Sequence, residues 1–145
     1  MKTKNLVSLA GSILLLLVVT RIHAQKATAL TIEVTHFEGD HGQAVIHLFR
    51  KQDDIPKKPY LKLTEMITNK KATLVFDNIP YGEYAVIVFH DENNNGELDH
   101  RFGFPNEPMG FSNQWKLSLF SGMPTFEKLH FTFDKQSFYY TIVIR

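Results

Sequence analysis

The chain of 145 residues has room for one domain, and its 43% of hydrophobic residues suffices for a buried core. It contains no cysteine, which excludes disulfides, Cys-ligated zinc, thiol catalysis and a lipoprotein acylation site. A formal net charge of +1 argues against a strongly basic surface for nucleic acid.

Residues 1–24 have the pattern of a secretory signal peptide. Two lysines precede an apolar stretch centred on residues 13–19, and Ala24 offers a small residue for cleavage. The stretch is short and interrupted compared with the roughly 20 residues of a membrane span, and the alternative is an uncleaved N-terminal anchor. Cleavage leaves one domain, residues 25–145, with 13 basic and 15 acidic side chains. We therefore expect an exported protein in the periplasm, on the outer surface or in the medium.

Six later segments predict β-strands, because apolar and polar residues alternate in most of them with a period of two. These segments are residues 30–35, 43–49, 71–77, 83–90, 129–133 and 138–144. Residues 83–90 are apolar at almost every position, which predicts a central strand that is covered on both faces. No segment has a convincing helical period.

The segments between these strands read as turns and connections. Residues 51–71 are rich in lysine and contain Pro56 and Pro59, so we expect a connection with at most one helical turn. Residues 103–113 contain several Pro and Gly and predict a rigid, non-repetitive loop. The whole pattern predicts an all-β domain, an antiparallel β-sandwich of about seven strands.

The strongest site motif follows the predicted central strand. Oxygen-bearing side chains occupy alternate positions and a glycine comes next, as in the first nine positions of a calcium loop. A chain that curls around Ca²⁺ presents every second side chain to the ion, and Gly96 permits the turn. The hypothetical Ca²⁺ ligands are Asp91, Asn93, Asn95, Glu97 through its carbonyl, and Asp99.

The motif departs from a full calcium loop. Its twelfth position is Phe102 instead of glutamate, and two ligands are neutral, so we expect a Kd on the order of 10⁻⁴–10⁻³ M. Glu107, Asp77 or water is the candidate for a missing ligand. The alternative is a plain polar turn, because Asn95-Gly96 is a strong hairpin-turn dipeptide.

The run from Asn78 to Asp99, NIPYGEYAVIVFHDENNNGELD, resembles the bacterial secreted family catalogued as domain of unknown function 2141. Residues 103–113 and 122–133 are similar to further blocks of that family. The resemblance covers about residues 28–145 and implies export from a Gram-negative bacterium, but no established activity. The turn around Gly82 is also similar to prealbumin/transthyretin-like modules, and an immunoglobulin-like sandwich is the alternative.

A physical consequence concerns the two segments on either side of Phe102. Binding loops gather at one end of a sandwich, so we expect residues 91–99 and 103–113 to pack together. Glu107 would then lie near the acidic loop.

Other chemistry has weaker signals. The histidines His36, His41, His47, His90, His100 and His130 lack the short spacing of a specific copper or zinc site. Trp115, with Phe111 and Phe120, is a candidate aromatic platform for sugar, against a role in the core. No serine lies in a nucleophile-elbow context, and we assign no catalytic residue.

Our leading hypothesis is an exported, non-enzymatic β-sandwich module, stabilised by Ca²⁺, that binds a protein or another ligand in the cell envelope. The alternatives are a carbohydrate-binding accessory domain and a hydrolase that uses the carboxylates of residues 91–99 and Glu107. We expect no nucleic-acid partner and no membrane span after cleavage.

Overall fold

The computed structural model describes residues 28–145, and the predicted signal peptide lies outside this range. The described part is nearly all β, with one short helix, α1 (Phe126–Leu129), and one 3₁₀ turn, η1 (Ser112–Gln114). The prediction of an all-β domain is confirmed. Within residues 28–145, no helix has the length and apolar character that crossing a membrane requires.

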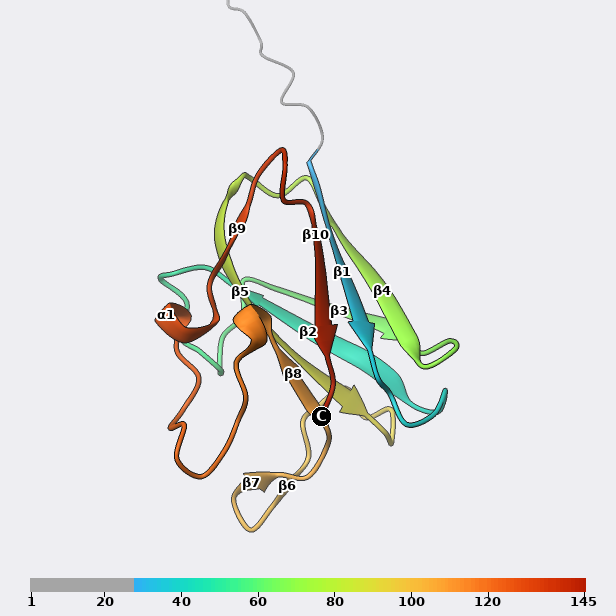
Figure 1. Cartoon of the computed structure of the whole chain (residues 1–145). Coiled ribbons are helices and arrows are strands. Elements are labelled where there is room, and N and C mark those ends of the chain that lie inside the picture. The colour runs from blue at the N-terminus through green and yellow to red at the C-terminus, as the bar shows by residue number, and fades with distance from the viewer. Residues whose placement is uncertain (1–27) are drawn as a thin grey trace, which may run out of the picture.

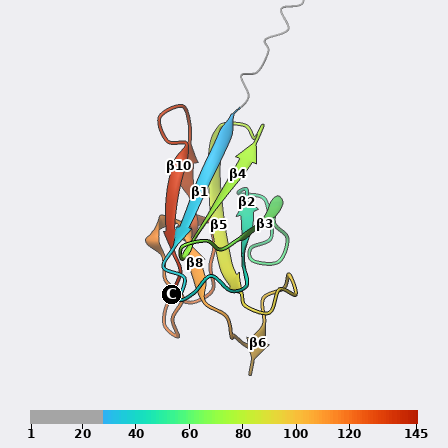
Figure 2. The ribbon, with the colours of Figure 1, turned by 90° about the vertical axis from the view of Figure 1, so that its right-hand side faces the viewer.

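The first sheet has three strands and contains both the first and the last strand of the described chain. In spatial order these are β10 (Tyr139–Val143), β1 (Ala29–Thr35) and β4 (Lys71–Asp77). β1 pairs antiparallel with β4 and parallel with β10, so Ile32 lies opposite both Leu74 and Tyr140. Figure 2 shows these strands as one layer in front of β5.

The second sheet is built around β5 (Gly82–Asp91). Its order is β3 (Leu61–Met66), β2 (Gln43–Phe49), β5 and β8 (Met109–Phe111). β9 (Phe131–Phe133) pairs with the beginning of β5, on residues 82–84, whereas β8 pairs with residues 87–89. All pairs in this sheet are antiparallel.

The main hydrophobic core lies between the two sheets. The alternating apolar side chains of β1, β2 and β4 all enter it, as their period of two predicts. β5 contributes Val86 and Val88 to this core and turns Ala85 and Ile87 toward a second cluster on its other face. That cluster contains Phe111 and residues of α1. The predicted burial of both faces of the central strand is thus confirmed.

Several details of the predicted fold are wrong. The pairing is not wholly antiparallel, because β10 joins β1 in parallel. The expected connection at residues 51–71 contains β3, an edge strand whose side chains are mostly exposed and therefore show little apolar alternation. The predicted strand 129–133 begins instead with the end of α1, and only Phe131–Phe133 is extended.

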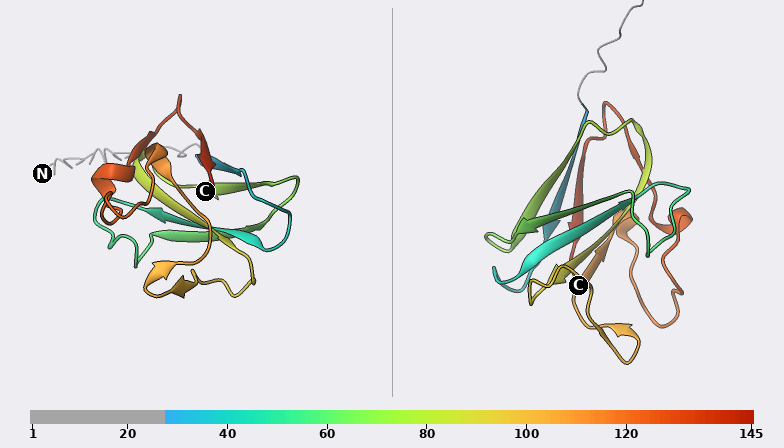
Figure 3. Two further views of the ribbon diagram at one scale, coloured as in Figure 1. Left: turned by 60° about the horizontal axis from the view of Figure 1, so that its bottom comes forward. Right: turned by 180° about the vertical axis from the view of Figure 1, so that it is seen from behind.

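The predicted loop at residues 103–113 also contains regular structure. Phe104–Pro105 forms β7, which pairs with β6 (His100–Arg101), and Met109–Phe111 forms β8. The described residues therefore form ten strands where about seven were expected, although β6 and β7 have two residues each. The β6–β7 hairpin and the loop between η1 and α1 project from the same end of the molecule (Figures 1 and 3).

The two sheets approach each other closely where β8 meets the C-terminal residues. Met109 and Arg145 exchange two backbone hydrogen bonds of 3.1 and 3.0 Å. Gly110 is the next residue of β8 and faces β10, because a Cβ atom there would be 2.8 Å from Ile142 Cγ2 and 2.9 Å from the Val143 carbonyl oxygen. Only a residue without a side chain fits this contact.

We expect Gly110→Ala to lower the free energy of unfolding by about 1–3 kcal/mol, because the added methyl group overpacks a backbone contact. Gly82→Ala is the matched control, since its Cβ would come no closer than 4.0 Å to the Tyr84 ring. Urea unfolding of both variants measures the difference. Equal stabilities of the two variants would contradict the close approach of β8 and β10.

Candidate functional site

The site starts at Asp91, the last residue of β5, whose side chain has no exposed surface. Its Oδ2 accepts hydrogen bonds from Gln43 Nε2 at 2.6 Å and from the Gly96 N–H at 2.7 Å. Its Oδ1 accepts one from the Asn95 N–H at 3.1 Å. A buried carboxylate requires such partners. The chain after Asp91 therefore curls back over its own side chain.

These hydrogen bonds also control the ionisation of Asp91. Burial disfavours the charged form, but the donors from Gln43 and from the loop N–H groups outweigh it. The pKa of Asp91 is consequently held below its usual value of 3.8. The carboxylate is therefore charged at neutral pH.

The rest of the loop is held by its own side chains. Asn93 Oδ1 accepts from the Asn95 N–H at 3.0 Å, and Asn95 Oδ1 accepts from the Glu97 N–H at 2.7 Å. The amide groups of Asn93 and Asn95 donate to the two carboxylate oxygens of Asp99, at 2.6 and 3.1 Å. Side-chain hydrogen bonds thereby link four of the five predicted ligand residues into one compact turn, namely Asp91, Asn93, Asn95 and Asp99. The fifth, Glu97, contributes only its N–H, and its side chain is exposed.

Backbone conformation supports the turn. Gly96 has a φ of +79°, the left-handed region in which glycine is favoured, as the motif predicted. Lys62 of β3 donates a hydrogen bond to the Gly96 carbonyl, which ties the loop to the edge of the second sheet. The loop is therefore anchored at both β5 and β3.

Glu107 joins the loop from the segment that precedes β8. It is 6% exposed, and its two carboxylate oxygens accept the N–H groups of Glu92 at 3.0 Å and of Asp99 at 3.1 Å. Asn106 also donates its N–H to the Asp99 carbonyl at 2.8 Å. Segments 91–99 and 103–113 thus pack together with Glu107 between them, as expected. Asp77 lies beside Ala29 at the opposite end of the molecule and is not part of this site.

This arrangement fits a structural role for the carboxylates better than acid–base catalysis. The oxygens of Asp91 and Glu107 all accept backbone or amide hydrogens and sit in fixed positions. Asp91 Oδ1 and the two Glu107 oxygens accept one hydrogen bond each and keep a second lone pair that can face a cation, whereas Asp91 Oδ2 already accepts two. The arrangement of these carboxylates therefore supports a cation-binding loop more than it supports a hydrolase.

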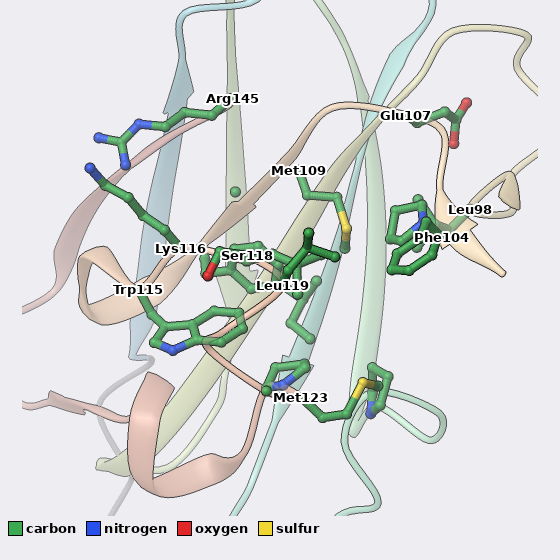
Figure 4. A pocket seen from close by; sticks show the side chains of 18 of the residues that line it. Leu98, Phe104, Glu107, Met109, Trp115, Lys116, Ser118, Leu119, Met123 and Arg145 are labelled. Carbon is green, nitrogen blue, oxygen red and sulfur yellow. The ribbon is translucent and has the colours of Figure 1, made fainter. Parts of the chain in front are cut away.

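A cavity of about 840 Å³ lies next to this loop, at the end of the molecule that carries the β6–β7 hairpin. One wall comes from residues 98–111, directly after the loop, and the other from residues 115–124. Most of its lining is apolar and includes Leu98, Phe104, Met109, Trp115, Leu119 and Met123, which Figure 4 shows around a common space. In the same view the charged ends of Lys116 and Arg145 lie on one side and Glu107 on the other.

The three aromatic residues predicted as a sugar platform are not assembled as one surface. Trp115 lines the cavity, with its ring edge-on to Phe111 at a centroid distance of 4.8 Å. Phe111 is buried in the second core cluster, and Phe120 is 98% exposed outside the cavity. Sequence reasoning found Trp115 but missed the cavity, because its walls come from segments without a shared motif.

The histidines differ in their surroundings. His47 is flanked by Phe49 and Phe89, and burial together with the nearby Lys62 charge lowers its pKa to about 4. Among the described residues, one group of three metal-binding side chains has donor atoms within 4.8 Å of one another, namely His41, His90 and Glu92. Sequence spacing did not indicate this group, because His41 and His90 are far apart in the chain.

Comparison with known proteins gives one family. A family model described as "Uncharacterized protein conserved in bacteria (DUF2141)" matches residues 32–139. No curated protein and no solved structure gives a significant match. The resemblance found in the sequence is confirmed, and the family brings no activity with it.

The hydrogen bonds of Asp91 predict a pH-dependent stability. The folded pKa is below the unfolded one, so Asp91 stabilises the fold above about pH 4. This contribution is lost as the pH falls through the folded pKa. We expect Asp91→Asn to lower the free energy of unfolding by about 1–3 kcal/mol at pH 6. This difference in stability between the variant and wild type should become smaller toward pH 3.

Urea unfolding across this pH range measures the difference in the free energy of unfolding between the variant and wild type. Asp134→Asn is the matched control, because Asp134 also accepts two turn N–H groups but lies outside the loop. If the difference in unfolding free energy between Asp91→Asn and wild type stays constant with pH, this result would contradict the lowered pKa of Asp91.

Proposed function

This chain belongs to the bacterial family DUF2141, and we propose that it is a non-enzymatic binding module that holds a small amphiphilic molecule in the cavity beside the loop. The cavity of about 840 Å³ carries the proposal. Sites for small ligands commonly have 300–1,000 Å³ and a mainly apolar lining with a few polar groups. We also keep the predicted sandwich type, prealbumin/transthyretin-like or immunoglobulin-like, as part of the proposal.

The lining and the rim indicate the chemistry of the ligand. An apolar body would be covered by side chains such as Met109, Leu119 and Met123. Lys116 and Arg145 lie on the same side of the cavity, where they would attract an anionic group (Figure 4). We therefore propose a ligand with a hydrocarbon or aromatic body and an anionic head.

Calcium has a supporting role in this proposal. The loop would bind Ca²⁺ through Asp91, Asn93, Asn95, the Glu97 carbonyl and Asp99, with Glu107 as an additional residue of the site. Asp91 and Glu107 already have fixed positions, which lowers the ordering cost of binding. Because residues 98–111 continue from the loop into the cavity wall, a bound ion would stiffen that wall.

Export is the setting in which weak calcium binding is useful. Calcium sites with a Kd of 10⁻⁴–10⁻³ M are characteristic of extracellular modules. The signal-peptide pattern of residues 1–24 supports the same location. We propose that the mature domain works in the periplasm, on the outer surface or in the medium, bound to a molecule of the cell envelope.

Calcium should raise the stability of the wild-type protein. At 10 mM Ca²⁺ the expected gain is about 1.4–2.7 kcal/mol for a Kd of 10⁻³–10⁻⁴ M. Asp99→Ala should abolish this gain, because Asp99 supplies a carboxylate to the loop. Asp134→Ala, a turn aspartate outside the loop, should retain it. Thermal unfolding with and without Ca²⁺ measures all three proteins, and an equal shift in the Asp99→Ala and control variants would refute the calcium site.

The cavity should bind 8-anilinonaphthalene-1-sulfonate, which has an apolar body and an anionic group. Leu119→Asp should weaken binding at least tenfold, because a carboxylate would face the apolar body of the dye. Phe120→Asp is the control, since Phe120 is the next residue and does not line the cavity. A fluorescence titration measures the three affinities. Equal weakening by both variants, or binding of sugars instead of the dye, would overturn the proposed ligand class.

A further inference from the structure

We propose that His41, His90 and Glu92 form a binding site for a transition-metal dication of the Zn²⁺ or Cu²⁺ class, separate from the calcium loop. His41 comes from the turn between β1 and β2, His90 lies near the end of β5, and Glu92 follows directly after β5. Glu92 Oε1 lies 3.8 Å from His90 Nδ1 and 3.9 Å from His41 Nε2. One carboxylate oxygen is therefore between two imidazole nitrogens.

The protonation of His90 is what points to a ligand. Its Nε2 lies 2.8 Å from the His41 carbonyl oxygen, and a carbonyl only accepts, so this nitrogen carries the proton. In the neutral ring Nδ1 then has a free lone pair. The His90 side chain has no exposed surface, and Nδ1 has no hydrogen-bond partner. A cation bound between His90 Nδ1 and the Glu92 carboxylate would explain why this buried acceptor has no hydrogen-bond partner.

The contacts of His90 match those of a metal-binding histidine. Such residues usually donate the second ring N–H to a carbonyl or carboxylate, which fixes the tautomer and aims the other nitrogen at the metal. The His90 ring also packs edge-on against Phe37, at a centroid distance of 5.1 Å. The backbone of Gly42 closes its other side, because a Cβ there would be 3.0 Å from His90 Nε2. His90 is thus held rigidly with Nδ1 in a defined position.

The other two side chains are free to adjust. The side chains of His41 and Glu92 are 59% and 47% exposed. In a tetrahedral zinc site the ligand atoms are roughly 3.4 Å apart, given metal–ligand bonds of about 2.0–2.2 Å. The two distances from Glu92 Oε1 to the imidazole nitrogens must shorten by roughly 0.5 Å, and the separation of the two histidine donor atoms, which is within 4.8 Å, must also approach this value. Rotation of the two exposed side chains would bring these atoms closer.

The donor set selects the metal class. Two imidazole nitrogens and one carboxylate suit Zn²⁺ and Cu²⁺, whereas Ca²⁺ and Mg²⁺ require mainly oxygen ligands. Three protein ligands leave a further position for water or for a group of a partner molecule. His47 Nε2 is the other buried ring nitrogen without a partner in the described residues, but the Lys62 charge beside it disfavours a cation.

Calorimetric titration with Zn²⁺ tests the site, in the presence of excess Ca²⁺ so that the oxygen-rich loop does not compete. We expect one Zn²⁺ per chain and at least tenfold weaker binding for His41→Ala and for Glu92→Gln. His130→Ala is the matched control, because His130 is also exposed and lies 4.0 Å from Glu83 but has no second histidine. Both test residues are on the surface, and circular dichroism of each variant checks that it is folded.

Nitrogen-15 NMR of the histidine rings supplies a readout that does not depend on the variants. Before addition of Zn²⁺, His90 should be protonated at Nε2 only, and Zn²⁺ should shift Nδ1 while Nε2 keeps its proton. A His90 ring protonated at both nitrogens and unaffected by Zn²⁺ would mean an ion pair with Glu92 and overturn the proposal. Equal Zn²⁺ affinity in wild type and His41→Ala would overturn it as well. Neither result would alter the calcium and dye experiments.

Discussion

The burial of β5 on both faces is the constraint on which the rest of the structure depends. Val86 and Val88 face the core between the sheets, and Ala85 and Ile87 face the second cluster. β5 stays buried up to its last two residues, so His90 and Asp91 also have no exposed surface. A polar group in such a place needs hydrogen bonds, and only neighbouring segments can provide them. The geometry at this end of the molecule follows from that need.

The loop after Asp91 satisfies this requirement and resembles a calcium loop for the same reason. The carboxylate of Asp91 accepts N–H groups from Asn95 and Gly96, so the backbone must curl around it. Within that curl, Asn93 and Asn95 accept backbone N–H groups through their Oδ1 atoms and donate to the Asp99 carboxylate through their amide groups. The turn is therefore stabilised by its own polar side chains. Glu107 then ties Glu92 and Asp99 to the segment that leads into the cavity wall, so loop and cavity form one unit.

Much of the fold was accessible from local patterns. The strands at residues 43–49 and 71–77 have the predicted bounds, because alternation of apolar residues directly reports a strand with one face in the core. β3 was not predicted, because an exposed edge strand has no buried apolar face and therefore shows little alternation of apolar residues. The parallel pairing of β10 with β1 was not predicted either, because alternation carries no information on strand direction. The position of Glu107 was predicted from the nearness of two loops at one end of a sandwich.

The sequence by itself determined the all-β class, the central strand, the oxygen-rich turn at residues 91–99 and the family, since these depend on patterns within short segments. Only the tertiary structure decided that residues 98–111 and 115–124 enclose a cavity and that His41 meets His90. His41 and His90 are 49 positions apart in the chain, and the two cavity walls are neighbouring segments without a shared motif. The occurrence of these contacts depends on how the sheets pack and on which register each strand adopts, and neither is encoded by the spacing of residues along one segment.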